Sequence, residues 1–195
     1  MKNNVPGRIT ESLISVGAVP PEDKAIYEYG IKMGLFMVIN VATAVLIGLM
    51  LGMIWQSIVF LLAYNPVRSY VGGYHASTQL NCYLLSIPMM LAMLLAIKLV
   101  PWNGYICILA LLCAVVVIEI LAPVEDPNKP LNEREKKVYK GRARIYSATL
   151  SGAAIILWFA GMKQISLSIV MALVVAAVML ILGAIKNRRI IEEKA

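Results

Sequence analysis

The side chains best suited to chemistry lie in one short polar stretch between apolar segments. Residues 68–82 form the longest largely polar, glycine-bearing interruption in the apolar first two-thirds of the 195-residue chain. They include the only histidine, His75, and one of the three cysteines, Cys82, seven positions later. A cysteine and a histidine within hydrogen-bonding distance provide a thiolate nucleophile and a general base that later returns its proton. The pair therefore indicates acyl-transfer chemistry.

The spacing of the two residues requires a bend between them. On one straight helix, seven residues would separate the side chains by about 10 Å along the axis, too far for a hydrogen bond. The glycine pair at 72–73 and the polar run 77–79 predict a break in the helix. Two plainer roles stay open: His75 as a hydrated interface residue, and Cys82 as a small packing residue at the start of a span.

Four neighbouring residues are further candidates for binding the substrate or an oxyanion. Arg68 suits a lipid phosphate, a substrate carboxylate or developing negative charge. The amides of Gly72 and Gly73 are candidate oxyanion donors, although we favour a tight turn for these glycines. Gln79 completes this set.

The remaining reactive side chains lie in or near apolar spans. Cys107 and Cys113 lie well inside one span, where we expect protonated thiols that serve packing. Glu119 lies near the end of that span, where an acid is costly and needs a partner. Its partner is His75, a basic residue or the substrate. One histidine and one nearby cysteine are too few ligands for a metal site, so we expect no metal and no other cofactor.

The composition places these residues in a membrane protein. The chain is 60% hydrophobic with a mean hydropathy of +0.77, and apolar runs of about 18 residues recur. The run from 31 to 64 is too long for one crossing, so we split it near 52–56 into a span at 31–54 and a shorter segment that crosses or re-enters at 57–66. Further helices are expected at 83–100, 105–122, 147–161 and 165–185.

The predicted fold is therefore an all-α polytopic membrane protein with about six membrane-embedded helical segments plus an N-terminal amphipathic helix, at 8–18. We expect a single integral membrane domain over 1–195. Its parts are an N-terminal interfacial helix (1–30), a first apolar pair (31–66), the catalytic stretch (67–82), a helix pair (83–122), a cytoplasmic basic connection (123–146), a helical hairpin (147–185) and a basic tail (186–195).

The charge distribution predicts how the chain lies in the plasma membrane. Of 18 basic residues, seven lie between Lys129 and Arg144 and four between Lys186 and Lys194, within a net charge of +7. Such clusters beside apolar spans face the cytoplasm and anionic lipid rather than nucleic acid. Trp55, Trp102 and Trp158 then share the outer interface, and the stretch holding His75 faces the cytoplasm. A homodimer remains open.

At these motifs the chain resembles the accessory gene regulator protein B (AgrB) family. The resemblance rests on Arg68, the run Gly72–Ala76, Cys82 and the proline-bearing run Ala122–Pro130 with the basic segment after it. Order, spacing and hydropathy match along most of the chain.

The resemblance implies a membrane cysteine endopeptidase of Gram-positive quorum sensing. Such proteins cut the carboxyl-terminal part from a precursor peptide through an acyl-enzyme thioester, and a cysteine or serine of the peptide then closes a thiolactone or lactone ring. Carried over, Cys82 is the nucleophile and His75 the base. Arg68 and the basic segment with Lys129, Lys136 and Lys137 become contacts for a precursor that has an amphipathic amino-terminal helix and an acidic tail.

The main alternative is a small membrane transporter or exporter of peptide without covalent chemistry. The polytopic architecture and an acid within a span are compatible with it. Serine and zinc intramembrane proteases are disfavoured, because neither a GxSG nor an HExxH motif occurs in the chain.

Overall fold

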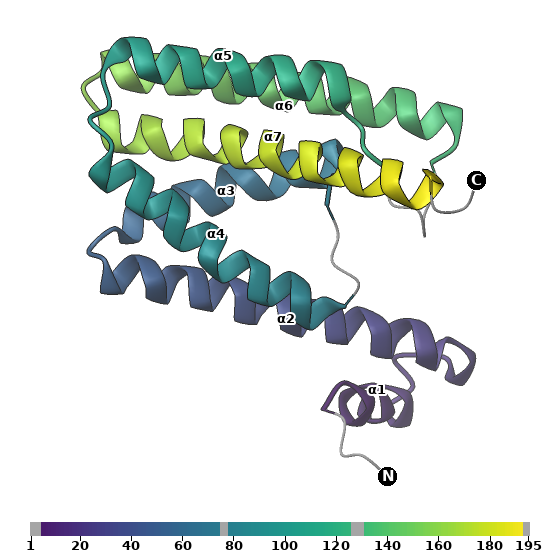
Figure 1. The fold of residues 1–195 in the computed structure, drawn as a ribbon. Coiled ribbons are helices and arrows are strands. Elements are labelled where there is room, and N and C mark those ends of the chain that lie inside the picture. Colours follow the sequence, from purple (N-terminus) through teal and green to yellow (C-terminus); the bar gives the residue numbers. More distant parts are fainter. Residues whose placement is uncertain (1–4, 75–77, 126–130, 193–195) are drawn as a thin grey trace. The chain divides into compact units, whose positions relative to one another are not determined.

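The described chain is almost entirely helical. The computed structural model describes residues 5–74, 78–125 and 131–192, and these ranges contain no strand, only one isolated bridge (Figure 1). The helices are, in order, α1 (Val5–Ser15), a 3-10 turn (Pro21–Asp23), α2 (Lys24–Met50), α3 (Ile54–Val71), α4 (Gln79–Leu99), α5 (Gly104–Leu121), α6 (Glu133–Phe159) and α7 (Lys163–Glu192).

Four of the helical segments are long and apolar enough to cross a membrane: Pro21–Met50, Gln79–Leu99, Gly104–Leu121 and Lys163–Arg188. The chain is therefore an all-α polytopic membrane protein, as predicted. α3 and α6, which were counted among about six embedded segments, are less apolar. α3 carries Gln56, Asn65 and Arg68, and the first half of α6 is highly charged.

The chain forms two compact units, Met1–Thr43 and Ala44–Ala195, and α2 runs through the boundary between them. In the first unit the predicted amphipathic helix is present, shifted by three residues to Val5–Ser15. It ends at Ser15, and Gly17, with a φ of 73°, lies in the turn that follows. The Glu11 carboxylate of this helix forms a 2.9 Å ion pair with the ammonium of Lys24, at the start of α2.

The long apolar run breaks close to where it was predicted to. α2 ends at Met50, Gly52 adopts a φ of 69°, and α3 begins at Ile54. The predicted end of the second segment at residue 66 was wrong, because α3 continues to Val71 and has Pro66 inside it. Polar residues do not by themselves end a helix. The glycine pair at 72–73 does.

Two other boundaries differ from prediction. Residues 133–146 of the charged connection join the span at 147–161 in one helix, α6, which starts early because Asn132 and Glu135 form a reciprocal capping box. The basic tail after residue 186 is helical as far as Glu192, as part of α7. α4 and α5 match the predicted spans to within four residues.

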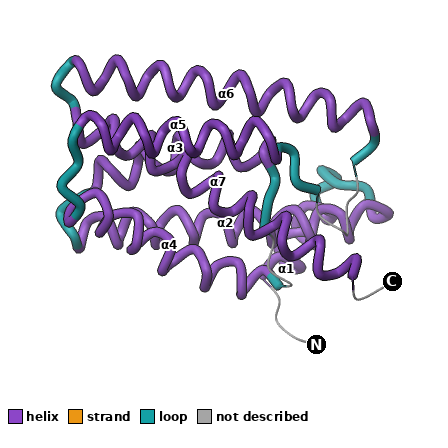
Figure 2. The backbone as a smooth tube through the Cα atoms, turned by 45° about the horizontal axis from the view of Figure 1, so that its top comes forward, coloured by secondary structure: helices purple, strands orange, loops and turns teal. Residues whose placement is uncertain are grey.

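α7 is the central element of the second unit. It packs on α3, α4, α5 and α6, and Val170, Leu173 and Leu180 on it are fully buried (Figures 1 and 2). A helix that is apolar on almost every side needs either lipid or other helices around it, and most of the apolar part of α7 is buried inside the protein. α7 therefore contributes atoms to whatever site forms at either end of this unit.

The two ends of the second unit differ in character. The α2–α3, α4–α5 and α6–α7 connections gather at one end (Figure 2). Trp55, Trp102 and Trp158 all lie in these connections or in the helical turns beside them, and Gln56 approaches Gln164 to 3.5 Å there. The opposite end holds the carboxyl ends of α3 and α7, the start of α4 and the basic first half of α6.

Candidate active site

The chain leaves α3 through a turn that Arg68 holds closed. Gly72 and Gly73 have φ values of 75° and 115°, which residues with a Cβ adopt rarely. The Arg68 guanidinium donates hydrogen bonds to the carbonyl oxygens of Gly72 and Tyr74. The planar fork of arginine can satisfy two carbonyls at once. In this structure Arg68 therefore fixes the backbone directly before His75.

The turn pairs with the α5–α6 connection on one side. The Val124 amide donates to the Val71 carbonyl at 3.0 Å, and the Gly73 amide donates to the Val124 carbonyl at 3.3 Å, which makes a short parallel bridge. The Gly72 amide donates to the Arg68 carbonyl at 3.2 Å. Both glycine amides are thus engaged in the turn, the role we favoured for them over oxyanion binding.

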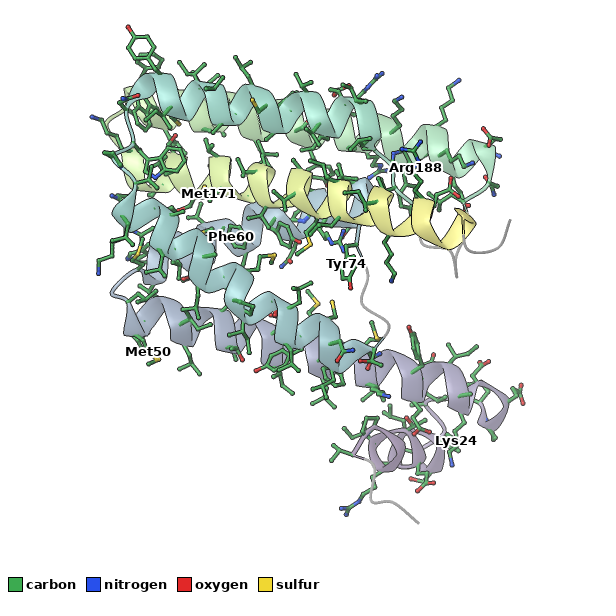
Figure 3. The ribbon with its side chains drawn as sticks, in the orientation of Figure 1. Lys24, Met50, Phe60, Tyr74, Met171 and Arg188 are labelled. Carbon is green, nitrogen blue, oxygen red and sulfur yellow. The ribbon has the colours of Figure 1, made fainter. Side chains whose placement is uncertain are left out.

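On the other side the turn lies against α7. The Tyr74 amide donates to the Met179 carbonyl at 2.8 Å. Gly183, one helical turn further along, faces the backbone of Gly73 and Tyr74 so closely that it has no room for a Cβ. The Lys186 ammonium lies 5.0 Å from the centre of the Tyr74 ring, which sits beside α7 (Figure 3).

Cys82 is an exposed thiol in the first turn of α4. Thr78 caps this helix by accepting a 3.2 Å hydrogen bond from the Asn81 amide, and the Cys82 amide donates to the Thr78 carbonyl. His75 lies outside the described residues, so its pairing with Cys82 stays a prediction.

The other two thiols lie far from this end of the unit. Cys107 is buried in α5, and Cys113 lies on an exposed face of the same helix, in the middle of a candidate span. An apolar surrounding keeps a thiol protonated. Cys107 packs in the core, as expected, whereas the packing role expected for Cys113 stays a prediction.

The chain also matches a known protein family. The family model described as Accessory gene regulator B covers residues 7–181, which is most of the chain. The chain belongs to the accessory gene regulator B family. AgrB membership ties it to the processing of quorum-sensing peptides.

Relatives with AgrB-like names occur in several bacteria. The chain is 30% identical to an AgrB-like protein of Listeria monocytogenes serotype 4a over 71% of its own length and 68% of the relative. It is 30% identical to one of Listeria innocua with the same coverage, and 24% identical to one of Clostridium perfringens over 77% and 74%. No solved structure matches the chain.

Two of the remaining predicted site residues of this AgrB chain, Glu119 and Lys136, form ion pairs. Glu119 pairs with Arg144 of α6 at 2.7 Å, so the costly acid has a basic partner. Lys136 lies 2.9 Å from Glu125 and 3.0 Å from Glu133, Lys137 is exposed, and Gln79 is half-buried at the start of α4. Lys129 lies outside the described residues.

Lys136 and Glu125 shift each other's pKa. The hydrogen bond from Lys136 is the main cause that lowers the pKa of Glu125 below its ordinary 4.5, and the same bond raises the pKa of Lys136. Glu125 also accepts the Leu131 amide at 3.2 Å, and its carbonyl accepts from the Asn187 amide group of α7 at 2.7 Å. Lys136 therefore holds the α5–α6 connection in shape rather than presenting an isolated charge.

Three contributors to the site were missed by the sequence analysis: Val124, Met179 and Gly183. Val124 and Met179 act through backbone atoms, which leave no trace in residue type. Gly183 did leave a signal, because a glycine inside a long apolar helix costs about 0.5–1 kcal/mol relative to alanine and needs a packing reason. It also lies just beyond the part of the chain that the AgrB model matches.

Proposed function

We propose that this chain is a membrane cysteine endopeptidase that cleaves the carboxyl-terminal part from a quorum-sensing precursor peptide and promotes closure of the remaining peptide into a ring. One observation supports it most. Cys82 is an exposed thiol in the first turn of α4, and Arg68, Val124 and Met179 fix the backbone of Gly73 and Tyr74 directly before His75. No other thiol of the chain lies near that histidine in sequence.

The proposed chemistry is a double acyl transfer. His75 takes the Cys82 proton, and the sulfur attacks the scissile carbonyl to give a tetrahedral intermediate. The C–N bond then breaks as His75 returns the proton to the leaving amine, which leaves the amino-terminal part of the peptide as a thioester on Cys82. A cysteine thiol or serine hydroxyl within the peptide attacks that thioester. Its proton passes to the released Cys82 sulfur, and a thiolactone or lactone forms.

The thioester route suits a site at a membrane surface. Exchange of one thioester for another is nearly balanced in free energy, whereas hydrolysis would waste the acyl-transfer potential. The intermediate survives only where water is restricted. Cys82 lies at the border between a span and a polar end of the unit, where the peptide can reach it from the membrane surface.

The orientation and the substrate belong to the same proposal. The basic first half of α6 and the carboxyl end of α7 lie at the end of the unit that holds Cys82, so by the positive-inside rule the site faces the cytoplasm of the plasma membrane. Exposed Lys137 and its basic neighbours suit the acidic tail of a precursor. An amphipathic amino-terminal helix on the precursor would hold it on the same leaflet.

Co-expression with the cognate precursor tests the proposal. Cys82→Ala and His75→Ala should each abolish release of the carboxyl-terminal fragment, and a Cys107→Ala/Cys113→Ala double variant should process normally. Wild type with a slowly cyclising precursor should also show a peptide adduct on Cys82 by mass spectrometry. Normal processing by Cys82→Ala would exclude a covalent mechanism through this thiol and leave a transporter as the alternative.

A further inference from the structure

We propose that Gly183 on α7 is a positioning residue for this reaction: it gives the backbone of Gly73 and Tyr74 the room to lie against α7, and so fixes the start of the segment that carries His75. The inference rests on the proposed Cys82–His75 mechanism. It assigns a role to a residue more than a hundred positions from that pair and beyond the region that the AgrB model matches.

The contact between α7 and the turn is made by backbone atoms on both sides. A Cβ on Gly183 would lie 2.5 Å from the Gly73 carbonyl carbon and 2.6 Å from the Tyr74 nitrogen. A Cβ on Gly73 would lie 2.7 Å from the Met179 oxygen and 2.6 Å from an Arg68 guanidinium nitrogen. No side-chain rotation relieves the backbone contacts, so the two glycines are both needed for this approach.

The close approach permits a specific hydrogen bond. The Tyr74 amide donates to the Met179 carbonyl at 2.8 Å, about one helical turn before Gly183 on the same helix. Met179 and Gly183 are both buried. If the segment moved away from α7, the Tyr74 donor would lose its partner, at a cost comparable to leaving a buried amide unpaired.

Tyr74, the residue directly before His75, is held through both of its backbone polar groups. The Tyr74 amide donates to the Met179 carbonyl of α7, and the Tyr74 carbonyl oxygen accepts from Arg68. Lys186 adds a contact over the Tyr74 ring at 5.0 Å. A methyl group at position 183 would push this segment out by about 0.9 Å to reach ordinary contact at 3.4 Å. A misplacement of about 1 Å in a catalytic group can cost about 100-fold in rate.

The chain supplies a matched control for the substitution. Gly152 lies inside α6 in the same unit, and a Cβ there would meet nothing within 4 Å. Gly152→Ala makes the same chemical change in a helix interior without touching the turn, so it should leave the enzyme unaffected apart from a gain in helix propensity.

The experiment uses the full chain in detergent with Cys82 as its only thiol, in the Cys107→Ala/Cys113→Ala background. Three quantities are measured: kcat and KM for the precursor, the rate at which iodoacetamide alkylates Cys82 as a function of pH, and the melting temperature. A His75→Ala variant defines the alkylation profile of an unpaired Cys82. We expect Gly183→Ala to lower kcat about 100-fold with KM little changed, and to move the alkylation profile towards that of His75→Ala.

The outcomes separate the two proposals. If His75→Ala leaves the alkylation profile unchanged, the Cys82–His75 pair itself is refuted and this inference with it. If His75→Ala changes the profile but a folded Gly183→Ala matches Gly152→Ala in kcat and profile, the role of Gly183 alone is refuted. A loss of activity in Gly183→Ala with an unchanged alkylation profile would also refute positioning of His75.

A second variant decides the question if Gly183→Ala does not fold. Lys186→Gln removes the contact over the Tyr74 ring without adding atoms next to the backbone. It should lower kcat about two- to fivefold and move the alkylation profile in the same direction, since a cation–π contact of this kind is modest. An unchanged profile in folded Lys186→Gln would then overturn the inference.

Discussion

Replacing Arg68 by lysine should loosen the segment before His75 while leaving the helices intact. The Arg68 guanidinium reaches the carbonyl oxygens of Gly72 and Tyr74 together. A lysine keeps the charge and much of the apolar stem, but its ammonium cannot reproduce a planar fork. The variant therefore keeps at most one of the two bonds. A hydrogen bond to a charged group contributes about 1.5–3 kcal/mol.

That loss of free energy predicts a measurable change in local opening. Losing about 1.5–3 kcal/mol corresponds to about a 10- to 150-fold larger population of molecules in which Gly73 and Tyr74 are detached from their partners. Hydrogen exchange of the purified protein in detergent should show faster exchange by about this factor at Gly73 and Tyr74, whose amides bond to Val124 and Met179. The exchange rates of amides in the middle of α7 should not change.

The control variant is Ser69→Ala on the neighbouring, exposed position. The Ser69 hydroxyl only donates back to the Asn65 carbonyl at 2.9 Å, so its loss should not affect the turn. Precursor cleavage by Arg68→Lys should fall together with the rise in exchange. Cleavage that falls while exchange at Gly73 and Tyr74 stays at the wild-type rate would refute this reasoning and place Arg68 on the substrate.

Three further changes test the packing and the electrostatics. Gly48→Ala would place a methyl group 2.8 Å from the Ser57 Cβ, and this overpacking should lower stability by about 1–3 kcal/mol in thermal unfolding. Phe60→Ala should cost about 3–5 kcal/mol in the same assay, because that ring is 1% exposed in the core (Figure 3). Glu125 has a lowered pKa in the folded chain, so its pairing with Lys136 stabilises the fold above pH 4.5 and is lost as pH falls through the folded pKa. Lys136→Gln should therefore flatten the acid side of a stability–pH curve, and an unchanged curve would show that the pair does not contribute.

Hydropathy and turn chemistry were enough to predict most of the helices. The apolar spans at 83–100 and 105–122 correspond to α4 and α5, and the break in the long run falls beside Gly52. Glu119 was expected to need a partner, and Arg144 of α6 supplies it. Such predictions succeed because apolar periodicity, glycine conformation and the cost of an isolated charge are properties of the residues themselves.

The arrangement around the turn could not be predicted in the same way. The long extent of α3 depends on Pro66 being tolerated within the helix and on polar residues continuing it, which composition alone does not reveal. The partners of Gly73 and Tyr74 are carbonyl groups of Val124 and Met179, and any residue type has such a group. Only the packing of α7 beside α3 and α5 determines which carbonyls come within reach.

The pairing of Tyr74 with Met179 has a consequence for how the protein is made. Met179 is synthesised about a hundred residues after Tyr74, and later than Arg68 and Val124, which also hold the turn. A nascent chain on the ribosome can already carry both His75 and Cys82 in the bilayer and still lack the helix against which this backbone rests. Proteolytic competence would then be gained late, when α7 has been inserted, so unfinished chains should be harmless to other peptides at the membrane.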